Sequence, residues 1–278
     1  MTNNRYALHA ITGQATAEFN PDQYSRFKFG DGELARQFGQ ALALGFASQR
    51  LPHIPADARL VVLPSPYAFI PTASYWMAQA FLRALNRLLV EQARPVAHEV
   101  KISRSITYRD DYGSLTLDER IRLIGNDSFQ VDPAALTGKT LLFIDDIRIT
   151  GSHQLVMERM LQQYNMTNPC IFVYYGQLTN SDVHPSIENY FNYYTVKSLS
   201  DLTPIIKSPQ FRINTRLVKY ILNHRPTEAH PFLAQQPESF LNELYDMAIG
   251  NEYHLIAEYE PTLTLLAQRL NIDYYQEL

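Results

Sequence analysis

The sequence is short of several features that would assign it to other protein classes. It has one cysteine in 278 residues, so no intrachain disulfide can form, which suits a reducing cytoplasm. No apolar run approaches the roughly 18 residues that a membrane span needs. The first residues lack the apolar core of a signal peptide. We therefore expect a cytoplasmic protein that does not cross a membrane.

Positive charge is also scarce. Lys and Arg number 24 against 28 Asp and Glu, a formal net charge of −4, which gives no electrostatic reason to expect nucleic-acid binding. Hydrophobic residues make up 46% of the chain and charged residues 19%, as is typical of a globular protein with a substantial core. The cysteine, Cys170, lies in an apolar run and is expected to be a buried structural thiol.

Short apolar segments alternate with helical patterns through the first two thirds of the chain. Strands are expected at 24–31, 60–63, 95–102, 141–144 and 170–175, and helices at 33–48, 72–90 and 154–164. This alternation predicts an α/β fold, a parallel sheet flanked by helices on both faces. In such sheets ligands bind beyond the carboxyl ends of the strands.

The last third of the chain has a different character. A last strand is expected at 193–196, and from 209 onward the patterns are helical only. Residues 176–278 hold twelve acidic and seven basic side chains, a net charge of −5. We expect residues 1–208 to form the α/β core. Residues 209–278 are expected to form an acidic helical C-terminal cap or dimerisation element, in a protein that is a homodimer.

The segment 140–153 carries the most information about function. An apolar strand ends in Asp145 and Asp146, and a short Thr150-Gly151-Ser152 turn leads into a helix. Backbone N–H groups and the helix dipole at such a turn favour a phosphate, and the acids suit hydroxyl groups or a hard cation. An ordinary strand-loop-helix connection with acids at the strand end is the alternative.

This segment resembles the phosphoribosyl pyrophosphate (PRPP) fingerprint of the type I phosphoribosyltransferases. The resemblance implies that Asp145 and Asp146 are catalytic, hold the ribose hydroxyls, and contact Mg²⁺ through water. It also implies a 5-phosphate loop made of Ile149, Thr150, Gly151, Ser152 and His153, although Ile149 and His153 replace residues that are usually small or hydroxylated. Carboxylates that face a site usually cost stability, so replacing both acids by Asn is expected to leave the melting temperature similar or raised.

The segment 64–73 occupies the place of the family's pyrophosphate loop, which implies that Ser65, Pro66 and Tyr67 bind pyrophosphate. Its Ile-Pro-Thr-Ala end resembles the Ile-Pro-x-Ala of orotate enzymes, but the loop contains no Lys, Arg or Gly. Without glycine the chain reversal is expected to need a cis peptide bond before Pro64 or Pro66. A simple proline-rich connection between strand and helix is the alternative.

A third resemblance lies at 108–113, which is similar to the flexible catalytic loop of adenine-type enzymes. The following residues, 115–120, resemble phosphoribosyltransferase-like competence proteins. The first similarity implies that Asp111 and Tyr112 are catalytic and that Arg104, Tyr108 and Arg109 belong to a loop that closes over the ligand. The resemblance also implies a hood over the acceptor, made by the N-terminal segment of the 1–208 core or by the cap. The acceptor base is expected to stack there, with Tyr24, Phe27, Phe29 and Tyr67 as candidate aromatic residues.

Together these similarities imply a Mg²⁺-dependent transfer of ribose 5-phosphate from PRPP to a nitrogen of a base-like acceptor, with release of pyrophosphate. Two alternatives stay open at this point. One is a non-catalytic regulator that binds PRPP or a nucleotide on the same fold. The other is an assembly protein whose acidic cap binds a partner. The sequence does not identify the acceptor.

Overall fold

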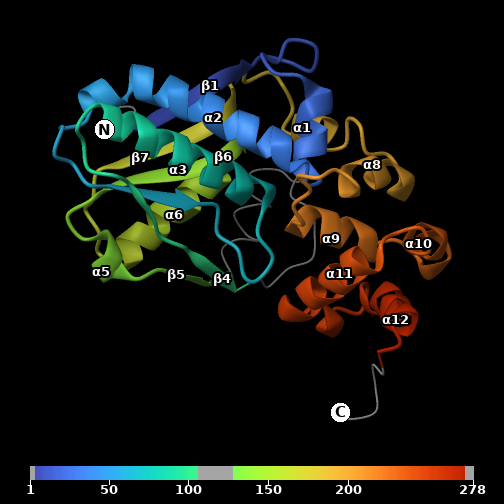
Figure 1. Cartoon of the computed structure of the whole chain (residues 1–278). Helices are drawn as coiled ribbons and strands as arrows, with labels where there is room; N and C mark the ends of the chain where they lie inside the picture. The colour runs from blue at the N-terminus through green and yellow to red at the C-terminus, as the bar shows by residue number, and fades with distance from the viewer. Residues whose placement is uncertain (1–3, 106–127, 273–278) are drawn as a thin grey trace.

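The computed structural model describes residues 4–105 and 128–272 and contains a five-stranded parallel sheet (Figure 1). The strand order is β1-β7-β6-β2-β3. Neighbouring strands pair in parallel throughout. The bounds are Arg5–Ile11 (β1), Leu60–Pro64 (β2), His98–Glu99 (β3), Thr140–Arg148 (β6) and Cys170–Leu178 (β7). A separate antiparallel pair joins β4 (Ser103–Ser105) to β5 (Ser128–Gln130).

Helices cover both faces of this sheet, because successive strand residues point to opposite sides. Leu142 and Ile144 of β6 pack with α1, α2 and α3, whereas Leu141 and Phe143 pack with α6. These helices span Pro21–Lys28 (α1), Gly32–Gln49 (α2), Ala73–Glu91 (α3) and Ser152–Gln163 (α6), and a short α5 covers Pro133–Leu136. The predicted α/β architecture is therefore confirmed.

The expected strand at 24–31 is wrong, because most of this segment is helix α1. Asn20 caps the helix by accepting the N–H of Asp22 at 2.9 Å, and Pro21 occupies the first turn. Tyr24 and Phe27, three residues apart, are both buried on the helix face that packs on the core. The alternating Phe-Lys-Phe pattern after them is typical of a strand, but the cap and this spacing favour a helix.

The expected last strand at 193–196 is also wrong. These residues follow helix α7 (Ile187–Asn192), and the N–H of Thr195 binds the hydroxyl of Ser25 at 3.1 Å. The sheet edge beside β7 is occupied instead by β1, whose residue Tyr6 pairs with Val173. The segment therefore does not pair with β7, and it contacts α1 through the bond between Thr195 and Ser25.

The C-terminal region forms a second hydrophobic core, as the helical pattern predicted. Its helices are α8 (Thr203–Ile206), α9 (Thr215–Leu222), α10 (Pro226–Leu233), α11 (Glu238–Gly250) and α12 (Glu260–Arg269), with single turns η3 (Leu199–Leu202) and η4 (Tyr253–Leu255). Another single turn, η1 (Leu51–His53), follows α2 in the first core. Figure 1 shows these helices gathered beside the sheet domain. The second core also includes Val196, Leu199 and Leu202, so the proposed boundary at 208 remains a prediction.

Hydrogen bonds fasten this helical cap to the loop between β2 and α3. The side chain of Asn251 accepts the N–H groups of Phe69 and Ile70 at 3.0 and 3.1 Å. Thr215, at the start of α9, donates its hydroxyl to the carbonyl of Ile70 at 2.8 Å and its N–H to Pro71 at 2.9 Å. The cap is thus attached to the segment that the sequence assigns to pyrophosphate.

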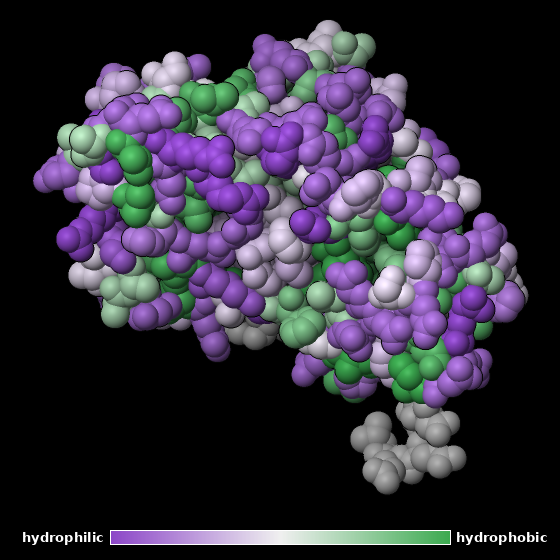
Figure 2. All heavy atoms as spheres, in the orientation of Figure 1, coloured by the Kyte–Doolittle hydropathy of each residue, from purple (hydrophilic) through white to green (hydrophobic). Residues whose placement is uncertain are grey.

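The surface carries few large apolar side chains. Figure 2 shows hydrophilic residues over most of one face, with apolar atoms in scattered patches. Among the residues described, no helix has both the length and the apolar character that a bilayer span requires.

Candidate phosphate and ribose site

A cavity of about 200 Å³ lies where β6 and β2 reach their carboxyl ends. Its walls come from the end of β6, the start of α6, the β2–α3 loop and several elements distant in sequence. The residues expected from sequence that line it are Ser65, Pro66, Arg104, Asp145, Asp146, Ile149, Thr150, Gly151, Ser152 and His153. Three segments that the sequence assigned to one ligand therefore meet at a single cavity.

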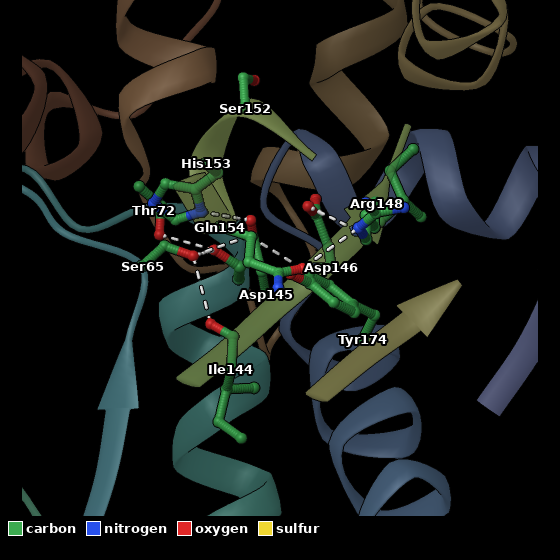
Figure 3. Close-up of polar contacts among 12 residues, drawn as sticks. Ser65, Thr72, Ile144, Asp145, Asp146, Arg148, Ser152, His153, Gln154 and Tyr174 are labelled. Atoms are coloured by element: carbon green, nitrogen blue, oxygen red, sulfur yellow. Dashed lines mark hydrogen bonds and ion pairs between the residues drawn. The ribbon is translucent and has the colours of Figure 1, made fainter. Parts of the chain in front are cut away.

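Asp145 is held by hydrogen bonds on both carboxylate oxygens. Its Oδ1 accepts the hydroxyl of Ser65 at 2.7 Å, and its Oδ2 lies 2.7 Å from Nδ1 of His153. Figure 3 shows Ser65 and His153 turned toward this carboxylate. Burial by itself raises the pKa of Asp145, but the facing His153 ring and the bonds from His153 and Ser65 outweigh it. The pKa is held below its usual value, so Asp145 is ionised at neutral pH.

Asp146 is the more deeply buried acid, with 6% of the residue exposed. Its Oδ2 is ion-paired with Nζ of Lys28 and accepts the hydroxyl of Tyr24 at 3.0 Å. Both partners come from α1, where the four-residue spacing places them on one helix face. Burial, followed by the Asp146 charge, raises the pKa of Tyr24 well above its ordinary value. Asp146 thus connects helix α1 to strand β6, and it also lines the cavity.

The predicted phosphate loop adopts a tight turn into α6. Gly151 has φ of +81°, a left-handed conformation that glycine adopts without strain. The Thr150 side chain accepts the N–H of Ser152 at 3.4 Å and donates to the Ser152 hydroxyl at 3.1 Å. The first N–H groups of α6 have no partner within the helix. The turn therefore offers N–H groups and a positive dipole end to an anion, as expected.

The two residues that depart from the fingerprint have separate roles. Ile149 is 8% exposed and packs its side chain into the core beside α2 and α3, so its side chain serves packing. His153 points back along the site and engages Asp145, which links the phosphate loop to the acid pair. Neither arrangement could be predicted from the motif, because each depends on the side chains that the fold brings into contact with Ile149 and His153.

The β2–α3 loop contains no cis peptide bond, so the expectation of a cis bond before Pro64 or Pro66 is wrong. Side-chain hydrogen bonds hold the loop instead. The Ser74 hydroxyl donates to Ser65 at 2.7 Å, and Thr72 caps α3 by accepting the N–H of Tyr75 at 3.1 Å. Because Ser65 then donates to Asp145, the start of α3 is connected to the acid pair.

The expectation of a stacking platform in the hood is also wrong for three of its four aromatic residues. Tyr24, Phe27 and Phe29 are at most 1% exposed, because they pack in the two cores. Tyr67 packs its ring 5.1 Å from that of Tyr75 and does not line the cavity.

The Cys170 thiol, which was expected to be buried, is partly buried, and burial raises its pKa to about 11. Predictions for Tyr108, Arg109, Asp111 and Tyr112 concern residues outside the described ranges.

Comparison with known proteins identifies a family for this chain. The model of the family described as PRTase ComF-like, where PRTase denotes phosphoribosyltransferase, matches residues 2–266. The chain belongs to the ComF-like PRTase family. A solved hypoxanthine-guanine phosphoribosyltransferase of L. donovani is similar at 16% identity, with 53% of this chain and 70% of that chain covered and a TM-score of 0.31. A Staphylococcus aureus hypoxanthine phosphoribosyltransferase matches at 9% identity, covering 51% and 74%, also with a TM-score of 0.31. No curated protein matches the chain.

The structure of this ComF-like PRTase also reveals cavity residues that the sequence analysis missed. Lys28 had a local signal, since the Asn20-Pro21 start and its spacing from Tyr24 indicate a helix face. Glu188 and Arg216 had none, because they belong to α7 and α9, far along the chain. The remaining missed residues are Thr72, Ser74, Ile147, Arg148, Gln154 and Tyr174.

The acid pair of this family member suits a hydrated Mg²⁺ better than a directly bound one. Among the described residues no three His, Cys, Asp or Glu side chains form a metal-binding group. Asp145 accepts bonds from Ser65, His153 and the N–H of Asp146, and Asp146 from Lys28, Tyr24 and the N–H of Ile147. Each carboxylate oxygen therefore already has a protein donor. An ion that keeps its water shell and binds the ligand's own phosphates is compatible with this arrangement.

Proposed function

We propose that this protein binds PRPP and transfers its ribose 5-phosphate group to a nitrogen of a small acceptor. The observation that carries the proposal is the convergence of the phosphate turn, the acid pair and the β2–α3 loop on one cavity. In the reaction a bond forms between the acceptor nitrogen and the anomeric carbon. The bond from that carbon to pyrophosphate breaks, and its electron pair leaves with the pyrophosphate. An acceptor nitrogen that carries a hydrogen gives up that proton to solvent or to the departing pyrophosphate.

The proposed roles follow from the contacts. The turn of Ile149, Thr150, Gly151, Ser152 and His153 holds the 5-phosphate through its N–H groups. Oδ2 of Asp145 and Oδ1 of Asp146 each have one protein donor, His153 and the N–H of Ile147. A carboxylate oxygen can accept a second hydrogen bond, so these two oxygens can still receive the ribose hydroxyls. Their negative charge stabilises the oxocarbenium-like transition state expected for substitution at an anomeric carbon.

The pyrophosphate is proposed to lie against Ser65 and Pro66, with Arg104 supplying positive charge from β4. Tyr67, the third residue expected there, does not line the cavity and is left out of the proposal. Mg²⁺ accompanies it as a hydrated ion, which neutralises phosphate charge and contacts Asp145 and Asp146 through water. Tyr108, Arg109, Asp111 and Tyr112 stay in the proposal as the loop that closes over the ligand. We also propose that the protein is a homodimer and that it is located in the cytoplasm.

The test is release of pyrophosphate from PRPP across a panel of nitrogenous acceptors, with calorimetric PRPP binding measured in parallel. Turnover that disappears in Asp145→Asn supports the transferase. PRPP binding without turnover for every acceptor supports the second candidate, a PRPP- or nucleotide-binding regulator. That candidate is favoured by one observation, the engagement of both acids by protein donors. Absence of PRPP binding contradicts the transferase, and absence of both PRPP and nucleotide binding contradicts the regulator as well.

A further inference from the structure

The end of the cavity beside Asp146 is built differently from the end beside Asp145. Asp145 lies next to the β2–α3 loop through its bond with Ser65. Asp146 faces the opposite group of elements, because its partners Lys28 and Tyr24 come from α1. Since the proposed function places pyrophosphate at the β2–α3 loop, the acceptor belongs at the Asp146 end.

Charged side chains line this end. Lys28 from α1, Glu188 from α7 and Arg216 from α9 all face the cavity. Helix α7, which carries Glu188, lies beside α1, because the ring of Phe191 is 6.2 Å from the ring of Tyr24. Arg216 contacts Tyr193, the residue that follows α7. Glu188 and Arg216 therefore belong to the elements that surround the Tyr24 and Lys28 side of the cavity.

Arg216 is held in position from two directions. Its Nη1 donates to the hydroxyl of Tyr193 at 3.2 Å, and its guanidinium lies 5.5 Å from the centre of that ring. Its helix is capped by the buried side chain of Asn214, which accepts the N–H of Leu217 at 3.1 Å. The neighbouring Thr215 binds the β2–α3 loop. The guanidinium is thus presented to the cavity by a fixed element of the cap.

A flat apolar base would need a stacking surface that this end does not offer. The described lining contains one aromatic residue, Tyr174, which is 3% exposed. The hood rings are buried in the cores. A guanidinium, in contrast, matches the planar geometry of a carboxylate, and a glutamate accepts a hydrogen bond from an N–H donor.

We propose that the acceptor of this protein is a small nitrogen compound that carries a carboxylate, held by Arg216, and an N–H donor, held by Glu188. This inference rests on the proposed function and specifies its substrate class. It also assigns the cap a role in specificity, because Arg216 is a cap residue.

Matched acceptor pairs test the substrate class. Orotate and uracil share N–H donors and differ by a carboxylate, as do 2-aminobenzoate and aniline. Pyrophosphate release from PRPP is measured for all four compounds. We expect at least one carboxylated compound to react about tenfold or more faster, by kcat/KM, than its neutral partner, the factor that one charge-assisted contact provides. A preference for the neutral partner in both pairs overturns the inference, as does equal reaction within both pairs.

The variants then test the assignment of residues. Arg216→Gln is expected to abolish the discrimination between paired compounds, and Arg216→Lys to restore part of it. Lys219→Gln removes one positive charge from the same helix at a residue that does not line the cavity, and is expected to retain the discrimination. Glu188→Gln is expected to raise KM for the carboxylated compound. Discrimination that persists in Arg216→Gln overturns the role of Arg216.

Measuring PRPP affinity separates a failure of this inference from a failure of the proposed function. Calorimetry without acceptor is expected to give the same PRPP affinity for the wild type and for Arg216→Gln. A tenfold loss in that variant places Arg216 on pyrophosphate and overturns the inference. A wild type that binds PRPP but reacts with no carboxylated compound overturns the acceptor class alone. A wild type that does not bind PRPP overturns the proposed function as well. If Arg216→Gln does not fold, the same comparisons are made with Arg216→Lys.

Discussion

Asp145 and Asp146 are adjacent in sequence but differ in their surroundings. Asp145 bonds to Ser65 and His153 within the site, whereas Asp146 is ion-paired with Lys28 and is less exposed. The side chains of the ion pair, Lys28 and Asp146, are 13% and 8% exposed. The two acids therefore respond differently to substitution, although the motif treats them as equivalent.

Asp145→Asn is expected to remove the acid-sensitive part of stability that this residue contributes. The pKa of Asp145 is below its usual value in the folded protein, because its partners outweigh burial. Its contribution is therefore present above the unfolded pKa of about 3.9 and is lost as the pH falls below it. Melting temperatures from pH 7 down to pH 3 are expected to differ most between wild type and variant at neutral pH. A difference that grows toward pH 3 contradicts this assignment.

Asp146→Asn is expected to destabilise the protein by about 3 kcal/mol, because it leaves the Lys28 charge nearly buried without its partner. This replaces the expectation from sequence that removing both acids leaves the melting temperature similar or raised. Denaturant unfolding measures the change. The double variant Lys28→Met with Asp146→Asn is the control, and it is expected to recover much of the loss. Equal destabilisation of single and double variants would show that the ion pair is not the cause.

At the scale of elements, Gly151 in the turn between β6 and α6 meets two requirements: a left-handed backbone conformation, and close packing of Arg148 where a side chain would otherwise be. A Cβ at Gly151 would lie 2.5 Å from Nη2 of Arg148, and the residue has a left-handed φ. Arg148 in turn donates from Nε to Gln154 at 3.3 Å. The glycine thus lets the end of the strand fold back closely against the start of the helix.

Gly151→Ala is expected to weaken binding of ribose 5-phosphate by about tenfold, because alanine strains the turn and displaces Arg148. Titration calorimetry with ribose 5-phosphate and PRPP measures the effect. Gly138→Ala is the matched control: Gly138 also has a positive φ, but a Cβ there meets nothing within 4 Å and the residue does not line the cavity. Unchanged affinity in Gly151→Ala would show that the turn does not hold the phosphate.

At the scale of the whole molecule, the ligand site and the cap are connected through one loop. The β2–α3 loop bonds to Asp145 through Ser65 and to the cap through Asn251 and Thr215. PRPP bound against this loop contacts an element that is fastened to both cores, because Ser65 and Pro66 line the cavity. Ligand binding is therefore expected to stabilise the molecule as one unit.

PRPP with Mg²⁺ at one hundred times its dissociation constant is expected to add about 2.7 kcal/mol of stability and to raise the melting temperature by several degrees. Differential scanning calorimetry checks this, with one transition expected for core and cap. Chelation of Mg²⁺ by EDTA is expected to reduce the shift, because the ion accompanies the pyrophosphate. A full shift in EDTA would remove Mg²⁺ from the proposal.

The sequence by itself determined the parallel sheet, and it predicted which strand end carries the candidate site. The short apolar run 141–144 is typical of a strand that is buried on both faces, and its residues do pack alternately into the cores on the two sides of the sheet. The Thr150-Gly151-Ser152 turn is local chemistry, so its conformation follows from nearby residues. The strand predicted at 24–31 was wrong because its aromatic pattern fits both the two-residue period of a strand and the period of a helix. The helix-capping residue Asn20 and the following Pro21 favour the helix.

The tertiary structure alone decided what surrounds the acids. Lys28, Glu188 and Arg216 lie far from Asp146 in sequence, and no local pattern relates them to it. The same holds for burial of the hood aromatics and for the β1 edge strand, since both depend on which surfaces meet. Charge and hydrophobic periodicity act over a few residues, whereas a binding site is assembled by contacts between distant segments. For this reason the sequence predicted which segments carry the candidate phosphate and ribose site, and the fold supplied the residues from which an acceptor class is inferred.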